Sequence, residues 1–286
     1  MKNQKIEIDA LRVLLETQLQ VLALTVVITH KGSATFLEQE LCSSLPDAVQ
    51  GVVTPMAMAV GGSVQSILEL SSGPAGSIRD CYPLARSVVE TMTNASYVLA
   101  GGTEIAEKAI RHAKQKYHRD MDRIFGKGSN TMRLRAVGVS EAELSSELKD
   151  ALDEFTAKNG REKSWTDDSV ATRISVIGEK LGPMVATRLL GAYALVYQDA
   201  SEIVHGSLYG INLFNIGRGK TPTNVEEFVE VANGHLIGIL YALFFAITSY
   251  VRSNAELQGH QALVDLDSGQ WERFEGLVKG QTTGDN

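Results

Sequence analysis

Cysteine is scarce in this chain, which has only Cys42 and Cys81 among its 286 residues. Two cysteines are too few for a disulfide scaffold, and these two lack the paired spacing of a zinc site. We therefore expect both thiols to be reduced and buried, as in a cytoplasmic protein. The N-terminal residues, MKNQKIEIDALRVLLETQ, lack the small-residue cleavage site of a signal peptide, which fits the same compartment.

An excess of basic residues is also missing. The chain has 27 Lys and Arg against 34 Asp and Glu, which gives a net charge of -7. This balance argues against proteins that coat nucleic acids or anionic membranes non-specifically, although it leaves room for a local basic groove. Hydrophobic residues make up 44% and charged residues 21%, which is ordinary for a globular protein with a large core.

The longest uncharged stretch covers residues 236–251, LIGILYALFFAITSYV. Its sixteen residues fall short of the roughly 20 that a membrane-spanning helix needs, and the polar Asn233 and His235 come just before it. We therefore expect a buried central helix and no membrane partner.

Alternating apolar and polar runs with tight turns are scarce, whereas helix boundary signals recur along the chain. The pattern predicts an all-α fold, an antiparallel bundle of about eight helices. The expected helices cover residues 6–29, 46–70, 78–100, 103–125, 143–158, 164–181, 183–210 and 223–252. The expected organisation is an N-terminal helical segment (1–72), a helical bundle (73–256) and a C-terminal extension (257–286).

Particular residues mark the expected boundaries. Gly101 and Gly102 should end one helix, Pro183 should begin another, and Thr223 with Glu226 should form a capping box. Residues 126–139, GKGSNTMRLRAVGV, are polar and rich in glycine, so we expect a loop there. Beyond residue 253 the composition turns polar, and we expect only a weak helical patch over residues 271–278.

Two segments place polar side chains in apolar surroundings. Arg86 and Glu90 stand four residues apart and face the same way on a helix, with Leu84, Val88, Val89 and Met92 around them. Tyr197, Ser201 and His205 are also spaced four apart, so they form one stripe with two hydroxyls and an imidazole that titrates near neutral pH. Arg86 and Glu90 form either a surface ion pair or, if they are partly buried, part of a site. The stripe forms either a site or a hydrogen-bonded contact between helices.

Other patterns are weaker. Glu202 and His205 have the spacing of a di-iron site, but no other histidine has a glutamate three residues before it, so we expect no metal and no cofactor. Arg111 and His118 stand seven apart on one helical face. One such pair is expected by chance in a chain of this composition, and a solvated basic face explains it.

The motif R-S-x-x-E-x-x-x-N at residues 86–94, a later tryptophan-led helix and Y-x-x-x-S-x-x-V-H-G at 197–206 resemble a bacterial family of helical proteins of unknown function. That family resembles, more distantly, the HEPN (higher eukaryotes and prokaryotes nucleotide-binding) domains. The resemblance covers about residues 77–252.

The HEPN resemblance implies an antiparallel helical bundle, a homodimer, and a metal-independent ribonuclease of a defence, toxin-antitoxin or stress system. His205 corresponds to the histidine that manages the proton of the ribose 2′-hydroxyl. At the position of the motif arginine stands Gln198, which donates hydrogen bonds but carries no charge. Arg86 is then the expected source of positive charge for the phosphate, supported by Glu90, Tyr197 and Ser201.

Two functions remain open from the sequence. The first is an RNA-directed effector that binds RNA or a nucleotide and cleaves RNA with His205 and Arg86. The second is a non-catalytic scaffold or regulatory module that binds a protein partner. The acidic charge, the missing motif arginine and the large apolar helices favour the second.

Overall fold

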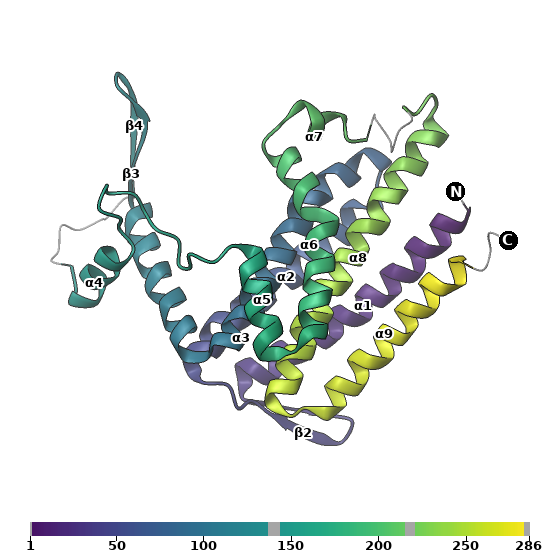
Figure 1. The fold of residues 1–286 in the computed structure, drawn as a ribbon, viewed down its shortest axis with the longest axis horizontal. Coiled ribbons are helices and arrows are strands. Elements are labelled where there is room, and N and C mark those ends of the chain that lie inside the picture. The colour runs from purple at the N-terminus through teal and green to yellow at the C-terminus, as the bar shows by residue number, and fades with distance from the viewer. Residues whose placement is uncertain (1, 137–143, 215–220, 283–286) are drawn as a thin grey trace.

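The computed structural model describes residues 2–136, 144–214 and 221–282, and it has the all-α architecture that the sequence predicts (Figure 1). Among these residues there are nine α-helices: α1 (Lys2–Lys31), α2 (Asp47–Leu70), α3 (Ile78–Asp120), α4 (Ser146–Glu154), α5 (Val170–Leu181), α6 (Pro183–Val204), α7 (Leu208–Asn212), α8 (Val225–Gln258) and α9 (Gln261–Thr282). The same residues include two β-hairpins, β1 (Ser33–Phe36) with β2 (Gln39–Cys42) and β3 (Asp122–Lys127) with β4 (Asn130–Arg135), and a 3₁₀ turn, η1 (Ala75–Ser77).

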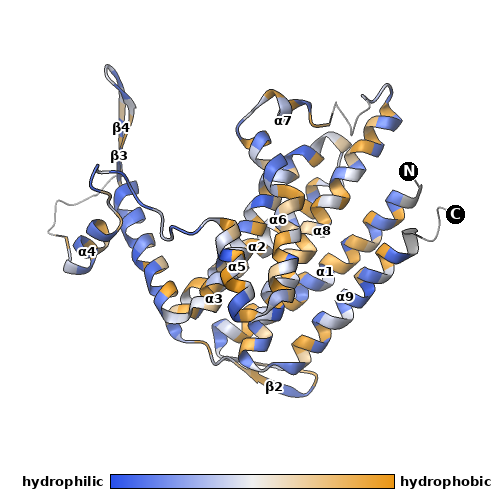
Figure 2. Ribbon diagram, in the orientation of Figure 1, coloured by the Kyte–Doolittle hydropathy of each residue, from blue (hydrophilic) through white to orange (hydrophobic). Residues whose placement is uncertain are grey.

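Helix α8 forms the centre of the bundle, and helices α1, α3, α6 and α9 pack against it. Figure 2 shows hydrophobic residues along much of α8 and of α1 beside it. Phe244, Ile247 and Tyr250 are among the side chains of α8 that are almost completely buried. Most of the uncharged stretch 236–251 is therefore buried in the core, as the sequence predicts.

The length of α8 corrects one argument from the sequence. The helix runs from Val225 to Gln258, well beyond the uncharged stretch, because polar residues at both ends continue it. Within the described part of the chain, three helical segments have the length and apolar composition to cross a bilayer: Gln4–Lys31, Asp47–Leu70 and Val225–Gln258. In the bundle, between 44% and 56% of the most apolar 18-residue stretch of each segment is buried against other parts of the protein.

The expected break at Gly101 and Gly102 is present, but as a kink inside α3 rather than as a gap between helices. Gly102 has φ 63° and ψ -147°, and the helix continues on both sides of it. Only glycine adopts such a conformation without strain. The second half of α3 thereby turns away from the bundle (Figure 1).

Other helix boundaries agree with the sequence in part. Pro183 begins α6 as expected, but α6 ends at Val204, where the sequence predicted a helix to residue 210. The cap of α8 is shifted by one residue: Asn224 Oδ1 accepts from the backbone N–H of Glu227 at 2.8 Å, and the Glu227 carboxylate accepts from the backbone N–H of Thr223 at 2.8 Å. The expected pair of Thr223 and Glu226 is therefore wrong.

The loop expected over residues 126–139 is wrong for its described part. Residues 130–135 form strand β4, which pairs with β3 in antiparallel register, with Phe125 opposite Met132 and Arg123 opposite Leu134. The hairpin stands at the far end of α3, away from the central helices (Figure 1). The expectation for cysteine is also wrong in part, since Cys81 is buried but Cys42 is exposed.

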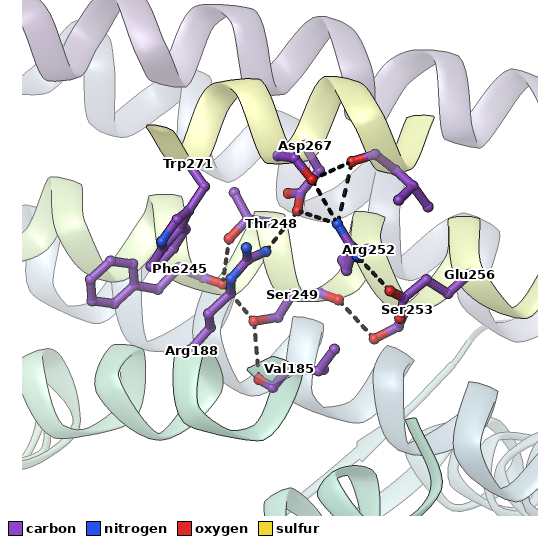
Figure 3. Close-up of polar contacts among 12 residues, drawn as sticks. Val185, Arg188, Phe245, Thr248, Ser249, Arg252, Ser253, Glu256, Asp267 and Trp271 are labelled. Carbon is purple, nitrogen blue, oxygen red and sulfur yellow. Dashed lines mark hydrogen bonds and ion pairs between the residues drawn. The ribbon is translucent and has the colours of Figure 1, made fainter. Parts of the chain in front are cut away.

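The polar C-terminal region forms a long helix, α9, where the sequence predicted only a weak helical patch. A buried ion pair holds α9 on the bundle: Arg188 Nη1 of α6 lies 2.9 Å from Asp267 Oδ2 (Figure 3). The Arg188 guanidinium also stacks on Trp271, 4.1 Å from the ring centroid, and Arg252 of α8 lies 3.8 Å from Asp267. One charge of this polar segment, that of Asp267, is thus buried and paired inside the protein, while Asp265, Glu272 and Glu275 are exposed.

Candidate functional site

The ion pair expected between Arg86 and Glu90 is present on α3. Arg86 Nε donates to Glu90 Oε1 at 2.9 Å, and the two side chains are 23% and 35% exposed. A pair this open to solvent contributes at most about 1 kcal/mol to stability. Burial disfavours the charge of Arg86, but the hydrogen bond and the negative charge of Glu90 outweigh it and raise the pKa of Arg86.

Tyr197 of α6 contacts Arg86 of α3. Its hydroxyl accepts from Arg86 Nη2 at 3.2 Å, and the guanidinium carbon lies 4.3 Å from the centroid of the Tyr197 ring. Tyr193, one turn earlier, has its ring centroid 4.3 Å from that of Tyr197. Arg86 therefore lies over the Tyr197 ring, which itself packs on Tyr193, and the cation–π contact is worth about 0.5–1 kcal/mol at a site open to water.

A second arginine, Arg173 of α5, joins the same surface. Its Nη1 donates to Asn94 Oδ1, and Asn94 is the last residue of the motif that begins at Arg86. Burial lowers the pKa of Arg173, although Glu90 and the tyrosines favour its charge. An arginine keeps its charge at neutral pH in proteins. Helices α3, α5 and α6 thus bring two guanidinium groups around Glu90.

Tyr97 and Asp168 lie beside Arg173 and act electrostatically on it. The Tyr97 hydroxyl donates to Asp168 Oδ2 at 2.7 Å, and its ring packs edge-on against Trp165, with centroids 5.9 Å apart. Burial and the hydrogen bond to Asp168 raise the pKa of Tyr97. Next to Asp168, Ser169 caps α5 by accepting from the N–H of Thr172 at 3.1 Å. This arrangement fixes the start of α5 and hence the position of Arg173.

We call Arg86, Glu90, Asn94, Arg173, Tyr193 and Tyr197 the α3–α5–α6 cluster. Sequence reasoning identified three of its members, Arg86, Glu90 and Tyr197. Asn94 was part of the quoted motif but had no role, while Arg173 and Tyr193 were missed. The spacing along α6 was a usable signal for Tyr193, because residues four apart share a helical face. No local pattern connects Arg173 with α3.

His205 and its neighbours lie outside the α3–α5–α6 cluster. His205 is the C-cap of α6, and its backbone N–H donates to the carbonyl of Ser201 at 3.0 Å. Eight residues separate it from Tyr197, which places it roughly 12 Å further along the helix axis. Its side chain is exposed, as is that of Gln198, and Ser201 is half-buried. Within the described residues, no hydrogen bond or ion pair joins the His205 imidazole to Arg86.

The weaker patterns have structural explanations. Arg111 forms a two-pronged pair with the Glu154 carboxylate of α4, at 2.8 and 3.1 Å, which links α4 to the outer half of α3. Among the described side chains, no three of the metal-ligating types gather in one place, near Glu202 and His205 or elsewhere.

A family model described as a family of unknown function (DUF5677) matches residues 51–220, more than half of the chain. The chain belongs to the DUF5677 family. The α3–α5–α6 cluster and His205 both lie within the DUF5677 region, whereas α8 and α9 lie beyond it. No curated protein and no solved structure matches the chain.

Proposed function

We propose that this DUF5677 protein is a HEPN-like, RNA-directed effector that binds single-stranded RNA at the α3–α5–α6 cluster. The observation that carries the proposal is the contact of Arg86 with the Tyr197 ring, beside the Tyr193 ring, at a partly exposed surface. Proteins bind single strands with positive groups on the phosphates and aromatic rings under the bases. Arg86 and Arg173 supply the first, and the two tyrosines supply the second.

His205 is the proposed general base for RNA cleavage. In that step the imidazole takes the proton of a ribose 2′-hydroxyl while the 2′-oxygen attacks the adjacent phosphorus. The bond from phosphorus to the 5′-oxygen breaks, and that oxygen takes a proton from water. The products are a 2′,3′-cyclic phosphate and a free 5′-hydroxyl, and no metal ion takes part. The step belongs in the cytoplasm, where RNA is available.

Arg86 contacts Tyr197, which lies about 12 Å along α6 from His205, and this separation changes the role first expected for Arg86. A guanidinium at that distance binds a phosphate beside the reacting one, so Arg86 is a binding group and not a stabiliser of the transition state. The substitution Arg86→Gln should therefore raise KM more than it lowers kcat, because an interaction that is equal in ground and transition states affects binding alone.

The test is an incubation of the full chain with mixed single-stranded RNA in EDTA, followed by end-group analysis. Wild-type protein should give cyclic phosphate ends, and His205→Ala should abolish them. His30→Ala is the matched control, since His30 is also exposed near the end of a helix. RNA that stays intact with the wild-type protein, or equal cleavage by His205→Ala, contradicts the catalytic step.

The second candidate is the non-catalytic module that binds a protein partner. The specific observation in its favour is that Arg86 already has an ion-pair partner in Glu90, while His205 stands apart. On this alternative, His205→Ala and Arg86→Gln change assembly or stability and no turnover is present. The incubation in EDTA separates the two functions directly.

A further inference from the structure

The β3–β4 hairpin exposes large apolar side chains in an unusual concentration. Ile124 is 70% exposed, Met132 57%, Leu134 52% and Phe125 41%. In the antiparallel register, Phe125 stands opposite Met132 and Arg123 opposite Leu134, so Phe125, Met132 and Leu134 share one face with Arg123, while Ile124 points to the other face. We call this the apolar face of the hairpin. A two-stranded hairpin alone is only marginally stable in water, and clustered exposed apolar residues mark an interaction surface.

The hairpin is also basic in an acidic protein. Residues 122–135 contain four Lys or Arg and one Asp, a net charge of +3. Since the whole chain carries -7, the remainder carries -10. Arg, Met and Phe are the residue types that protein interfaces favour. A second copy of this chain therefore offers the hairpin an acidic surface to which it is electrostatically attracted.

A cavity of about 670 Å³ has the complementary chemistry. It lies among α3, α6, α7 and α8, and its wall combines carboxylates with apolar side chains. The carboxylates are those of Asp199, Glu227 and Glu230. The apolar side chains include Leu195, Tyr209 and Leu213. Beside it, Val204, Leu208 and Ile211 are 57%, 75% and 52% exposed. The volume is in the range of pockets that enclose a small ligand, and so has room for large side chains from one face of a hairpin.

We propose that the hairpin of one copy inserts its apolar face into this cavity of a second copy, with Phe125 and Met132 as anchors. Arg123 and Lys127 flank the anchors and face the carboxylates of the cavity. Hairpin and cavity stand well apart within one chain (Figure 1), so the contact joins two copies. Two insertions related by a twofold axis close the assembly as a dimer. The contact between the two copies does not depend on the proposed RNA function.

Two variants test the contact from its two sides. Phe125→Ser with Met132→Ser removes the anchors from a hairpin that contributes nothing to the core. Gly234→Trp fills the cavity: Gly234 is on its wall, and a Cβ atom there meets nothing within 4 Å. The matched controls are Met58→Ser, at an exposed methionine of α2, and Gly62→Trp, at an open glycine of the same helix. Circular dichroism confirms that each variant is folded.

The measurement is molar mass by light scattering after size exclusion, over a range of concentrations. Wild type and both controls should reach twice the 31.0 kDa chain mass, and each test variant alone should stay monomeric. A mixture of the two test variants should recover a dimer held by one insertion, because each supplies what the other lacks.

Three results overturn the proposal: a wild-type protein that stays monomeric at high concentration, a hairpin variant that still dimerises, or a mixture that gives no dimer. A hairpin variant that keeps its oligomeric state but loses RNA binding also overturns it, since the hairpin then binds nucleic acid.

Discussion

Arg188 and Asp267 form an ion pair of 2.9 Å with side chains that are 4% and 0% exposed. It links α6, inside the family region, to α9, outside it. Burial raises the pKa of Asp267 and opposes its charge, whereas Arg188 lowers the pKa and favours it. Removal of one partner leaves the other charge buried and unpaired, which costs about 3–5 kcal/mol.

We therefore predict that Asp267→Leu lowers the free energy of unfolding by about 3 kcal/mol or more. The double variant Arg188→Met with Asp267→Leu should lose much less, because neither charge then stays in the core. Urea denaturation followed by circular dichroism measures both. The surface pair of Arg111 and Glu154 is the control, and Glu154→Gln should cost at most about 1 kcal/mol. Equal losses at the two pairs would contradict this account of α9.

A second prediction concerns the kink of α3. Gly102→Ala should destabilise the protein by about 1–3 kcal/mol, because φ 63° with ψ -147° is strained for any residue with a Cβ atom. The matched control is Gly61→Ala within the regular helix α2, where a Cβ atom meets nothing within 4 Å. That substitution should stabilise the protein by about 0.5–1 kcal/mol. Thermal denaturation of both variants gives the sign, and stabilisation by Gly102→Ala would contradict the kink.

The cysteines give a third prediction. Burial, with a smaller contribution from Asp80, raises the pKa of the Cys81 thiol to about 11. Because the thiolate is the nucleophile, Cys81 should resist iodoacetamide at pH 8 in the folded protein. Cys42 is exposed and should be labelled. Intact-mass analysis should show one adduct per chain under native conditions and two in urea; two native adducts would contradict the burial of Cys81.

The sequence predicted the helical class and several boundaries because those signals are local. Pro183 is typical of the first turn of a helix, and a glycine such as Gly102 allows the backbone to leave the helical conformation. The β3–β4 hairpin had a local signal that was not used: Gly128 and Ser129 are a favourable two-residue turn between Lys127 and Asn130. Their place in a polar, glycine-rich segment favoured a loop instead.

Long-range pairing explains what the sequence did not predict. Helix α9 has a polar sequence, and the partners of Asp267 and Trp271 come from α6 and α8, far away along the chain. No residue near α9 in the sequence therefore indicates that it packs on the bundle. Arg173 reaches Asn94 across 79 residues, and neither residue carries a pattern that points to the other. The stripe of Tyr197, Ser201 and His205 was visible as spacing, but only coordinates show that Arg86 meets its first residue and not its last.

Binding of single-stranded RNA by the α3–α5–α6 cluster is the central claim, and fluorescence anisotropy with a labelled oligonucleotide at fixed salt tests it most directly. The comparison is Arg86→Gln against Arg79→Gln, which removes the same charge from a more exposed position two turns earlier on α3. We predict that Arg86→Gln weakens binding about tenfold or more, the effect of losing one charge-assisted hydrogen bond, and that Arg79→Gln changes it little. Equal affinities for Arg86→Gln and wild type, or no binding by either, would contradict the account.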